Sequence, residues 1–424
     1  MENVNPHHVT TAQQSSSATI FYRVVLFAAF IFFAFNLRAH ITSVPSVVDY
    51  IKSDLKITSQ TAGLLSTIPI LCFGLMMPFM SWVVSKLGVD RALILTLSGI
   101  AVGVLVRSYA EISLAFLGTL IMGGAITMGN LISLMIIARD FKKYSDIITS
   151  IYVVAMSIGA MLTAGFTAPL AAVMGWQIAL AVWSVFAFIA IGFWLIVFKL
   201  RKANSEVDDS AVTSEKSNVP IGAFIPAWKR LNVWLIALCF ASHTFMFYSL
   251  TAWFPSYLQD VAQMSLEKAG SIASLFQIVS IIGCVLIPLL NRTGKFSRSM
   301  LFAVVAGSWL IMITGFLSAP NLWVIWLIFG GIASGGGFLV IFMLVMDLSR
   351  TMDENRSNSS FVQGIGYICA STGPTVVGSI HQHTESWNQS LIILPFLALM
   401  MLVMGMLATT KFNKTNLALQ NYAP

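Results

Sequence analysis

The chain has 424 residues, of which 57% are hydrophobic and only 10% are charged. Because soluble domains carry about 25% charged residues, this composition excludes a soluble protein and indicates an integral membrane protein in a lipid bilayer. The formal net charge is +7, but no basic cluster lies on a soluble domain, so we expect no nucleic-acid partner.

Apolar segments long enough to cross a membrane recur along the whole chain. A bilayer core of about 30 Å needs about 20 apolar residues in a helix. We predict twelve such spans, at residues 22–48, 60–84, 91–109, 112–138, 146–172, 177–199, 231–257, 267–290, 299–318, 322–346, 359–380 and 388–409. The predicted fold class is therefore an all-α integral membrane protein. The first apolar run is too long for a cleaved signal peptide, so we expect this helix to be retained as an anchor.

The twelve spans divide into two predicted bundles of six helices, residues 20–199 and residues 231–410. Residues 200–230 between them are polar and predict a linker. Residues 1–19 are expected to form a disordered tail, and residues 411–424 a second tail.

The two bundles repeat one another in sequence. At a constant offset of 207 residues, Gly123 matches Gly330 and Asp140 matches Asp347. Six plus six helices joined by a linker is the layout of transporters whose halves rock about a central site. The repeat therefore predicts two pseudo-symmetric halves.

Lys and Arg gather on one side of the predicted membrane. With the amino terminus inside, 19 of the 24 basic residues fall in inner segments and four in outer segments, Arg107 among them. Arg38 alone remains in mid-membrane. The positive-inside rule therefore places both termini and the linker in the cytoplasm.

Arg38 lies about 20 Å into the first predicted span. A guanidinium there costs at least about 2.5 to 3.5 kcal/mol, and none of the 17 acidic residues is placed in mid-helix to neutralise it. Arg also offers a rigid fork of donors that suits a carboxylate or an oxyanion. We predict that an anionic substrate binds Arg38; the alternative is that Arg38 binds helix-end carbonyls or water.

Other polar side chains inside the spans are candidates for the same site. The further predicted substrate-binding residues are Asn36, Asn130, Tyr248, Gln363 and Tyr367. Gln363 and Tyr367 are four residues apart and share one helix face. His40 and His243 are candidates for proton coupling, unless the substrate itself carries the proton. Hydrogen bonding between helices is the alternative for each of these side chains, and Asn36 and His40 fit a supporting role.

No pattern in the sequence indicates chemistry other than transport. The four cysteines lie inside predicted helices without a pairing pattern, so we expect neither disulfides nor a zinc site. No nucleotide-binding loop, paired His-Glu motif or nucleophile elbow is present. We therefore predict no enzymatic activity, no cofactor and no metal.

Several stretches resemble the major facilitator superfamily and, within it, the cyanate and 2-nitroimidazole transporter branch. They are "NLRAHITSVPS", "FYSLTAWFPSYL", "GGGFLVIFMLVMDLSR" and "FVQGIGYICASTGP". The resemblance covers residues 20–410. It implies a cavity lined by the predicted helices 22–48, 112–138, 231–257 and 322–346, with Arg38 facing the anion and with Gln363 and Tyr367 close by.

With this resemblance, we expect a monomeric secondary transporter in a bacterial inner membrane. It would take up a small organic or inorganic anion with protons by alternating access; a drug exporter of the same fold is the alternative. One loop departs from the family pattern, because Ser85 and Lys86 stand where the family usually has Asp and Arg. The usual cytoplasmic gating salt bridge is therefore in question.

Overall fold

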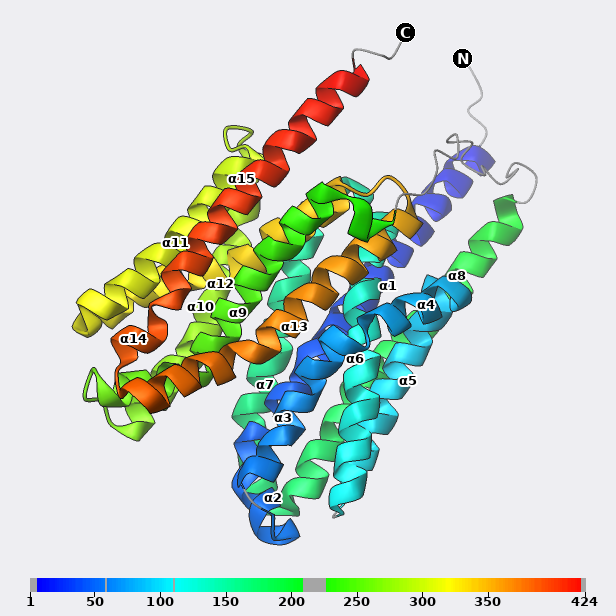
Figure 1. Cartoon of the computed structure of the whole chain (residues 1–424). Coiled ribbons are helices and arrows are strands. Elements are labelled where there is room, and N and C mark those ends of the chain that lie inside the picture. The colour runs from blue at the N-terminus through cyan, green and yellow to red at the C-terminus, as the bar shows by residue number, and fades with distance from the viewer. Residues whose placement is uncertain (1–5, 58, 110, 209–225, 421–424) are drawn as a thin grey trace.

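The computed structural model describes residues 6–57, 59–109, 111–208 and 226–420 (Figure 1). Within these ranges the regular elements are α-helices and short 3-10 helices, with no strand. The predicted all-α fold is confirmed.

Eight α-helices make up the N-terminal half. They are α1 (Pro6–Thr42), α2 (Val48–Leu55), α3 (Ser59–Leu75), α4 (Met77–Leu87), α5 (Val89–Arg107), α6 (Ile112–Asp140), α7 (Ser145–Ala181) and α8 (Val185–Asp208). Seven make up the C-terminal half. They are α9 (Leu231–Asp260), α10 (Leu266–Arg292), α11 (Arg298–Ser318), α12 (Trp323–Asp347), α13 (Met352–Thr384), α14 (Trp387–Leu391) and α15 (Ile393–Gln420).

These helices account for the twelve predicted spans. Among the described residues, nine continuous helical stretches are long and apolar enough to cross a membrane. One of them, residues 142–202, holds two spans separated at Gly175, whose φ of 81° breaks the helix. Helices α3 and α4 form one further span with a bend of 63°. The twelfth span is α13, which is long enough but carries charged and polar side chains at both ends.

The first span ends earlier than residue 48, where the sequence predicted its end. Helix α1 stops at Thr42, and a short 3-10 helix, Pro45–Val47, leads into α2. Pro45 explains the break, because proline lacks the backbone N–H that would continue the hydrogen-bond ladder.

Helices also extend into segments that the sequence predicted as tails and linker. Helix α1 begins at Pro6, inside the expected tail of residues 1–19, and proline suits the first turn of a helix. Helix α8 continues to Asp208 and α15 to Gln420. Residues 209–225 of the expected linker lie outside the described ranges.

The two halves repeat the same packing around a central helix. Helix α6 packs on α3 and α5, and α12 packs on α10 and α11. Glycines permit the close approach: a Cβ at Gly331 would meet the carbonyl of Val279, and one at Gly335 would meet the carbonyl of Ser280. The glycine pattern that predicted the duplication therefore serves helix packing.

Both the first described turn of α1 and the last turn of α15 lie at the same end of the molecule, here called the termini end (Figure 1). The halves contact each other through α13 against α3, α4 and α6, and through α7 against α10 and α12. Toward the opposite end the halves diverge, so that α2 and α14 lie apart in Figure 1.

Substitution of one packed glycine tests this helix packing. In Gly335→Ala the added Cβ collides with backbone, so we expect the variant to lose about 1–3 kcal/mol of stability. Gly307→Ala is the matched control, because nothing lies within 4 Å of a Cβ there. Thermal unfolding in detergent measures both; equal melting temperatures would contradict the described packing.

Candidate functional site

Arg38 projects from α1 of the N-terminal half toward the C-terminal half. Its guanidinium carbon lies 5.7 Å from the ring centre of Phe247 on α9 and 5.5 Å from that of Phe338 on α12. The side chain is partly buried. Arg38 therefore lies at the junction of the two halves.

The charge of Arg38 is incompletely compensated. Its guanidinium forms no hydrogen bond and no ion pair with any residue that the structure describes. A cation over an aromatic ring gains about 0.5–1 kcal/mol at exposed sites and about 2 kcal/mol when desolvated. The two phenyl rings thus offset only part of the cost of holding the cation there.

Three tyrosines, one from the N-terminal half and two from the C-terminal half, lie in the neighbourhood of Arg38. Tyr152 on α7, Tyr248 on α9 and Tyr367 on α13 all lie within electrostatic range of its guanidinium. The rings of Tyr248 and Tyr367 lie 6.5 Å apart, and Tyr367 contacts Phe73 of α3 at 4.9 Å. Among described residues, the hydroxyls of Tyr248 and Tyr367 have no hydrogen-bond partner. They are available as donors to a ligand.

Gln363 lies one turn before Tyr367 on α13 and is the clearest unsatisfied polar group in this region. The side chain is 1% exposed, and neither its amide nitrogen nor its amide oxygen has a partner among the described residues. Buried amides are almost always hydrogen-bonded, so an orphan of this kind indicates a missing partner.

Asn130 and Asn36 occupy different surroundings. Asn130 accepts a hydrogen bond from the hydroxyl of Tyr152 at 3.3 Å and so joins the group around Arg38. Asn36 is fully buried and spends its amide within α1, donating to the carbonyl of Phe32 at 2.7 Å and contacting His40 at 3.1 Å. Asn36 therefore makes its hydrogen bonds within α1 and fits a supporting role.

Both predicted histidines are fully buried, and each forms a hydrogen bond through one ring nitrogen. Nδ1 of His243 lies 3.2 Å from the indole nitrogen of Trp309, which can only donate, so this tautomer carries its proton on Nε2. The amide nitrogen of Asn36 is used on its own helix, so Nε2 of His40 is the donor to Asn36 Oδ1. His243 also packs edge-on against Phe338, with ring centres 4.5 Å apart.

Sequence reasoning missed several residues of this region. Phe247, Phe338 and Tyr152 contact or approach Arg38, but aromatic residues in apolar helices carry no signal that separates them from packing. Arg107 was counted with the outer segments, and it is the last residue of α5, but its side chain is buried and not exposed. It is 1% exposed and donates to the carbonyl of His40 at 2.8 Å, because it ends α5 with its side chain turned into the bundle.

The polar contacts described between the halves lie toward the termini end. Arg298 at the start of α11 lies 3.4 Å from Asp146 on α7 and 2.9 Å from Asp347 on α12. Arg356 on α13 donates to the carbonyl and the hydroxyl of Ser81 on α4, at 3.0 and 2.9 Å. The second contact joins α13 to α4, and Ser85 follows Ser81 by one turn within the same helix.

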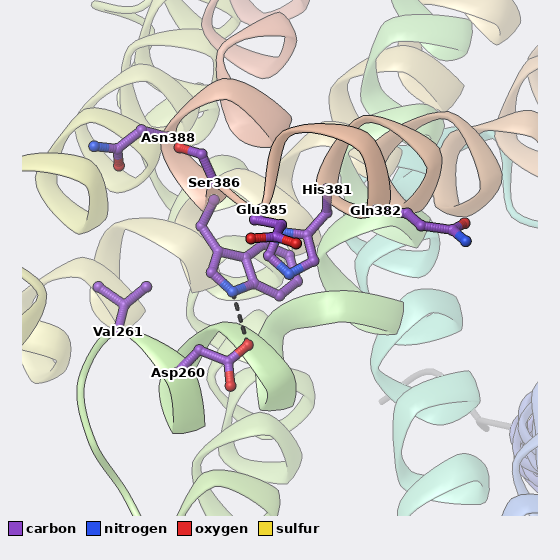
Figure 2. Close-up of a pocket in the computed structure, with 8 residues that line it drawn as sticks. Asp260, Val261, His381, Gln382, Glu385, Ser386 and Asn388 are labelled. Atoms are coloured by element: carbon purple, nitrogen blue, oxygen red, sulfur yellow. Dashed lines mark hydrogen bonds between the residues drawn. The ribbon is translucent and has the colours of Figure 1, made fainter.

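A separate pocket lies at the opposite end of the C-terminal half (Figure 2). It has a volume of about 570 Å³, and the indole of Trp387 donates to Asp260 at 2.9 Å beside it. None of the predicted site residues lines it. In the described part of the chain no group of three His, Cys, Asp or Glu side chains is placed to hold a metal ion.

Comparisons with known proteins agree with this architecture. The sequence pattern of the Major Facilitator Superfamily matches residues 24–375. An uncharacterized transporter of Bacillus subtilis, YycB, is 30% identical over 373 residues, 87% of this chain and 89% of that protein. The 2-nitroimidazole transporter of Escherichia coli is 27% identical over 387 residues (91% and 95%), and its cyanate transport protein CynX is 25% identical over 348 residues (81% and 86%).

The orphan amide of Gln363 gives a stability test of the site. Gln363→Leu removes two buried polar atoms without partners, so we expect the ligand-free protein to gain about 1–3 kcal/mol in its free energy of unfolding. Asn130→Leu is the matched control and should destabilise, because it deprives Tyr152 of an acceptor. Thermal unfolding of both variants without ligand decides; a destabilised Gln363→Leu would show that the amide has a partner.

Proposed function

The chain belongs to the Major Facilitator Superfamily, a family of transporters and not of enzymes, and from that premise we propose that it is a secondary active transporter for a small organic or inorganic anion. The observation that carries the proposal is the guanidinium of Arg38, which lies at the junction of the halves without a described carboxylate. A fixed cation of this kind attracts anions and repels cations, which argues against an exporter of cationic drugs.

The groups around Arg38 suit a small anion. The guanidinium supplies two parallel donors, and the hydroxyls of Tyr248 and Tyr367 and the amide of Gln363 supply neutral ones. Phe247 and Phe338 bound the space on the side of the C-terminal half. Cyanate, the cargo in the name of one relative, is an anion small enough for such a setting and is the first probe to use.

Alternating access follows from a site shared by two halves. The anion contacts Arg38 from one half and α9, α12 and α13 from the other, so its binding favours closure of the halves around it. Return to the opposite form requires the contacts Arg298 to Asp146 and Arg356 to Ser81 to separate. Because all the proposed ligands come from one chain, we propose a monomer as the transporting unit.

We propose that the termini end faces the cytoplasm of a bacterial inner membrane. The excess of Lys and Arg in the segments at this end supports the orientation, and the full-length relatives are bacterial. In this orientation the described contacts between the halves lie on the cytoplasmic side, and the halves diverge toward the outside.

Proton-coupled uptake is the driving force that we propose, with a proton moving together with the anion and not on either histidine. His243 would lose its bond from Trp309 on protonation at Nδ1, and it lies within range of the Arg38 cation. The free Nδ1 of His40 lies within range of the Arg107 cation. Like charges disfavour protonation, so neither ring suits a proton carrier.

Uptake of radiolabelled cyanate into proteoliposomes tests the proposed function. We expect Arg38→Ala to lose about 100-fold in uptake efficiency, because a charged hydrogen-bonding partner is removed. Arg38→Lys should remain impaired, since an ammonium offers no planar fork. Arg292→Ala is the matched control, because Arg292 is an exposed arginine at the end of α10. Full activity of Arg38→Ala would contradict the proposed role of Arg38.

An imposed pH gradient, acid outside, tests the proton carrier. The gradient should accelerate cyanate uptake by the wild-type protein. The ratio of uptake with the gradient to uptake without it should be the same in His243→Gln, even if the basal rate differs, because the imidazole stays neutral. His40→Gln should behave in the same way. If either variant kept anion exchange but lost its response to the gradient, that histidine would be the carrier and the proposal would be wrong.

A further inference from the structure

We propose that Arg107 is a positioning residue for Arg38, and that it acts by fixing the final turn of α1 to α5. This inference rests on the proposed function, because it concerns the residue that would bind the anion. Arg107 itself lies behind α1 and contacts neither Phe247 nor Phe338 among the described contacts.

Arg107 binds the end of α1 directly. Its Nη1 donates to the carbonyl of His40 at 2.8 Å, and its Nη2 donates to the hydroxyl of Ser43 at 3.4 Å. The carbonyl of His40 is one of the last four of α1, which have no partner within the helix. A cation at a helix C-terminus is also favoured by the helix dipole. Arg107 therefore caps α1 two residues beyond Arg38.

Side-chain hydrogen bonds run from the ring of His40 along one face of α1. Nε2 of His40 donates to Asn36 at 3.1 Å, and Asn36 donates to the carbonyl of Phe32 at 2.7 Å. These residues are spaced by four and share one face. Arg38 lies two positions from both His40 and Asn36, about 200° around the helix. The side chains of His40 and Asn36 therefore lie on the side of α1 away from Arg38, which faces α9 and α12. A bond that holds this end of α1 to α5 thus helps to set the direction of Arg38.

The other side of α1 is held by neutral groups. The hydroxyl of Thr163 on α7 donates to the carbonyl of Ala39 at 2.7 Å and lies 2.9 Å from the hydroxyl of Thr42. Hydrogen bonds from a charged donor are stronger than neutral ones. Arg107 is accordingly the charged restraint on the segment that carries Arg38, and the hydroxyls shared with α7 are the neutral ones.

The position of Arg107 is itself tightly set. A Cβ at Gly118 of α6 would collide with the backbone of Arg107, so α6 and the end of α5 lie in close contact. Arg107 forms no ion pair with any carboxylate that the structure describes, and its Nε has no partner. Burial of an unpaired cation is costly, and an apolar side chain would fill the same space more cheaply. The hydrogen bonds of Arg107 to α1 offset part of this cost.

Kinetics of radiolabelled cyanate uptake separate positioning from mere stability. We expect Arg107→Met to raise KM by about tenfold or more with Vmax per folded protein little changed, since a misplacement of about 1 Å costs up to about 100-fold. Arg107→Lys should recover part of the loss, because an ammonium still donates to one carbonyl. In Arg38→Ala the further change Arg107→Met should add nothing, because the two residues act as a unit.

Thr119→Val is the matched control, a buried hydroxyl on α6 whose bond stays within its own helix. It should lower stability without raising KM. The inference would be overturned if folded Arg107→Met kept the wild-type KM. It would also be overturned if the double variant lost uptake by the product of the two single losses. The proposed function would stand in both cases.

A second measurement does not depend on transport. With Arg38→Cys in a background lacking the four native cysteines, the rate of methanethiosulfonate modification reports how position 38 is presented. Adding Arg107→Met should change this rate by about fivefold or more, whereas Thr119→Val should leave it unaltered. An unchanged modification rate in Arg107→Met would refute the positioning role even if cyanate were not the cargo. If uptake were lost in Arg38→Ala but not in Arg107→Met, the proposed function would remain intact.

Discussion

The guanidinium of Arg38 lies in a membrane-spanning helix with two phenyl rings of the opposite half as its described partners. A cation in this setting is costly unless water or an anion reaches it, and the groups around it are arranged accordingly. The nearby hydroxyls of Tyr248 and Tyr367 have no described partner, and neither has the amide of Gln363, one turn from Tyr367. The rest of the site depends on this one incompletely compensated charge.

Division of the site between the halves connects ligand binding to motion. The N-terminal half contributes the charge, and the C-terminal half contributes the rings, two hydroxyls and the amide. In the proposed function neither half alone surrounds the anion, so its binding would stabilise their approach. Contacts at the termini end, such as Arg298 with Asp146, oppose separation of the halves on that side. A transport cycle must exchange one set of contacts for the other.

The sequence predicted the spans, the duplication and the exceptional position of Arg38, because apolar length, glycine register and an isolated charge are properties of the chain itself. It did not predict the direction of side chains at helix ends, and Arg107 was therefore counted with the outer segments although its side chain is buried. It also did not identify Phe338, since a phenylalanine that faces a cation resembles one that faces lipid. The hydrogen bond from Trp309 to His243 joins two helices and follows only from the fold.

The most direct test of the central claim is crystallographic. Selenocyanate is a small anion with an anomalous scatterer, and a structure of the wild-type protein with it should place a selenium peak beside the Arg38 guanidinium, between α1, α9, α12 and α13. The same experiment on Arg38→Ala should show no peak there. Selenium density at another place, or equal density in both proteins, would contradict the account.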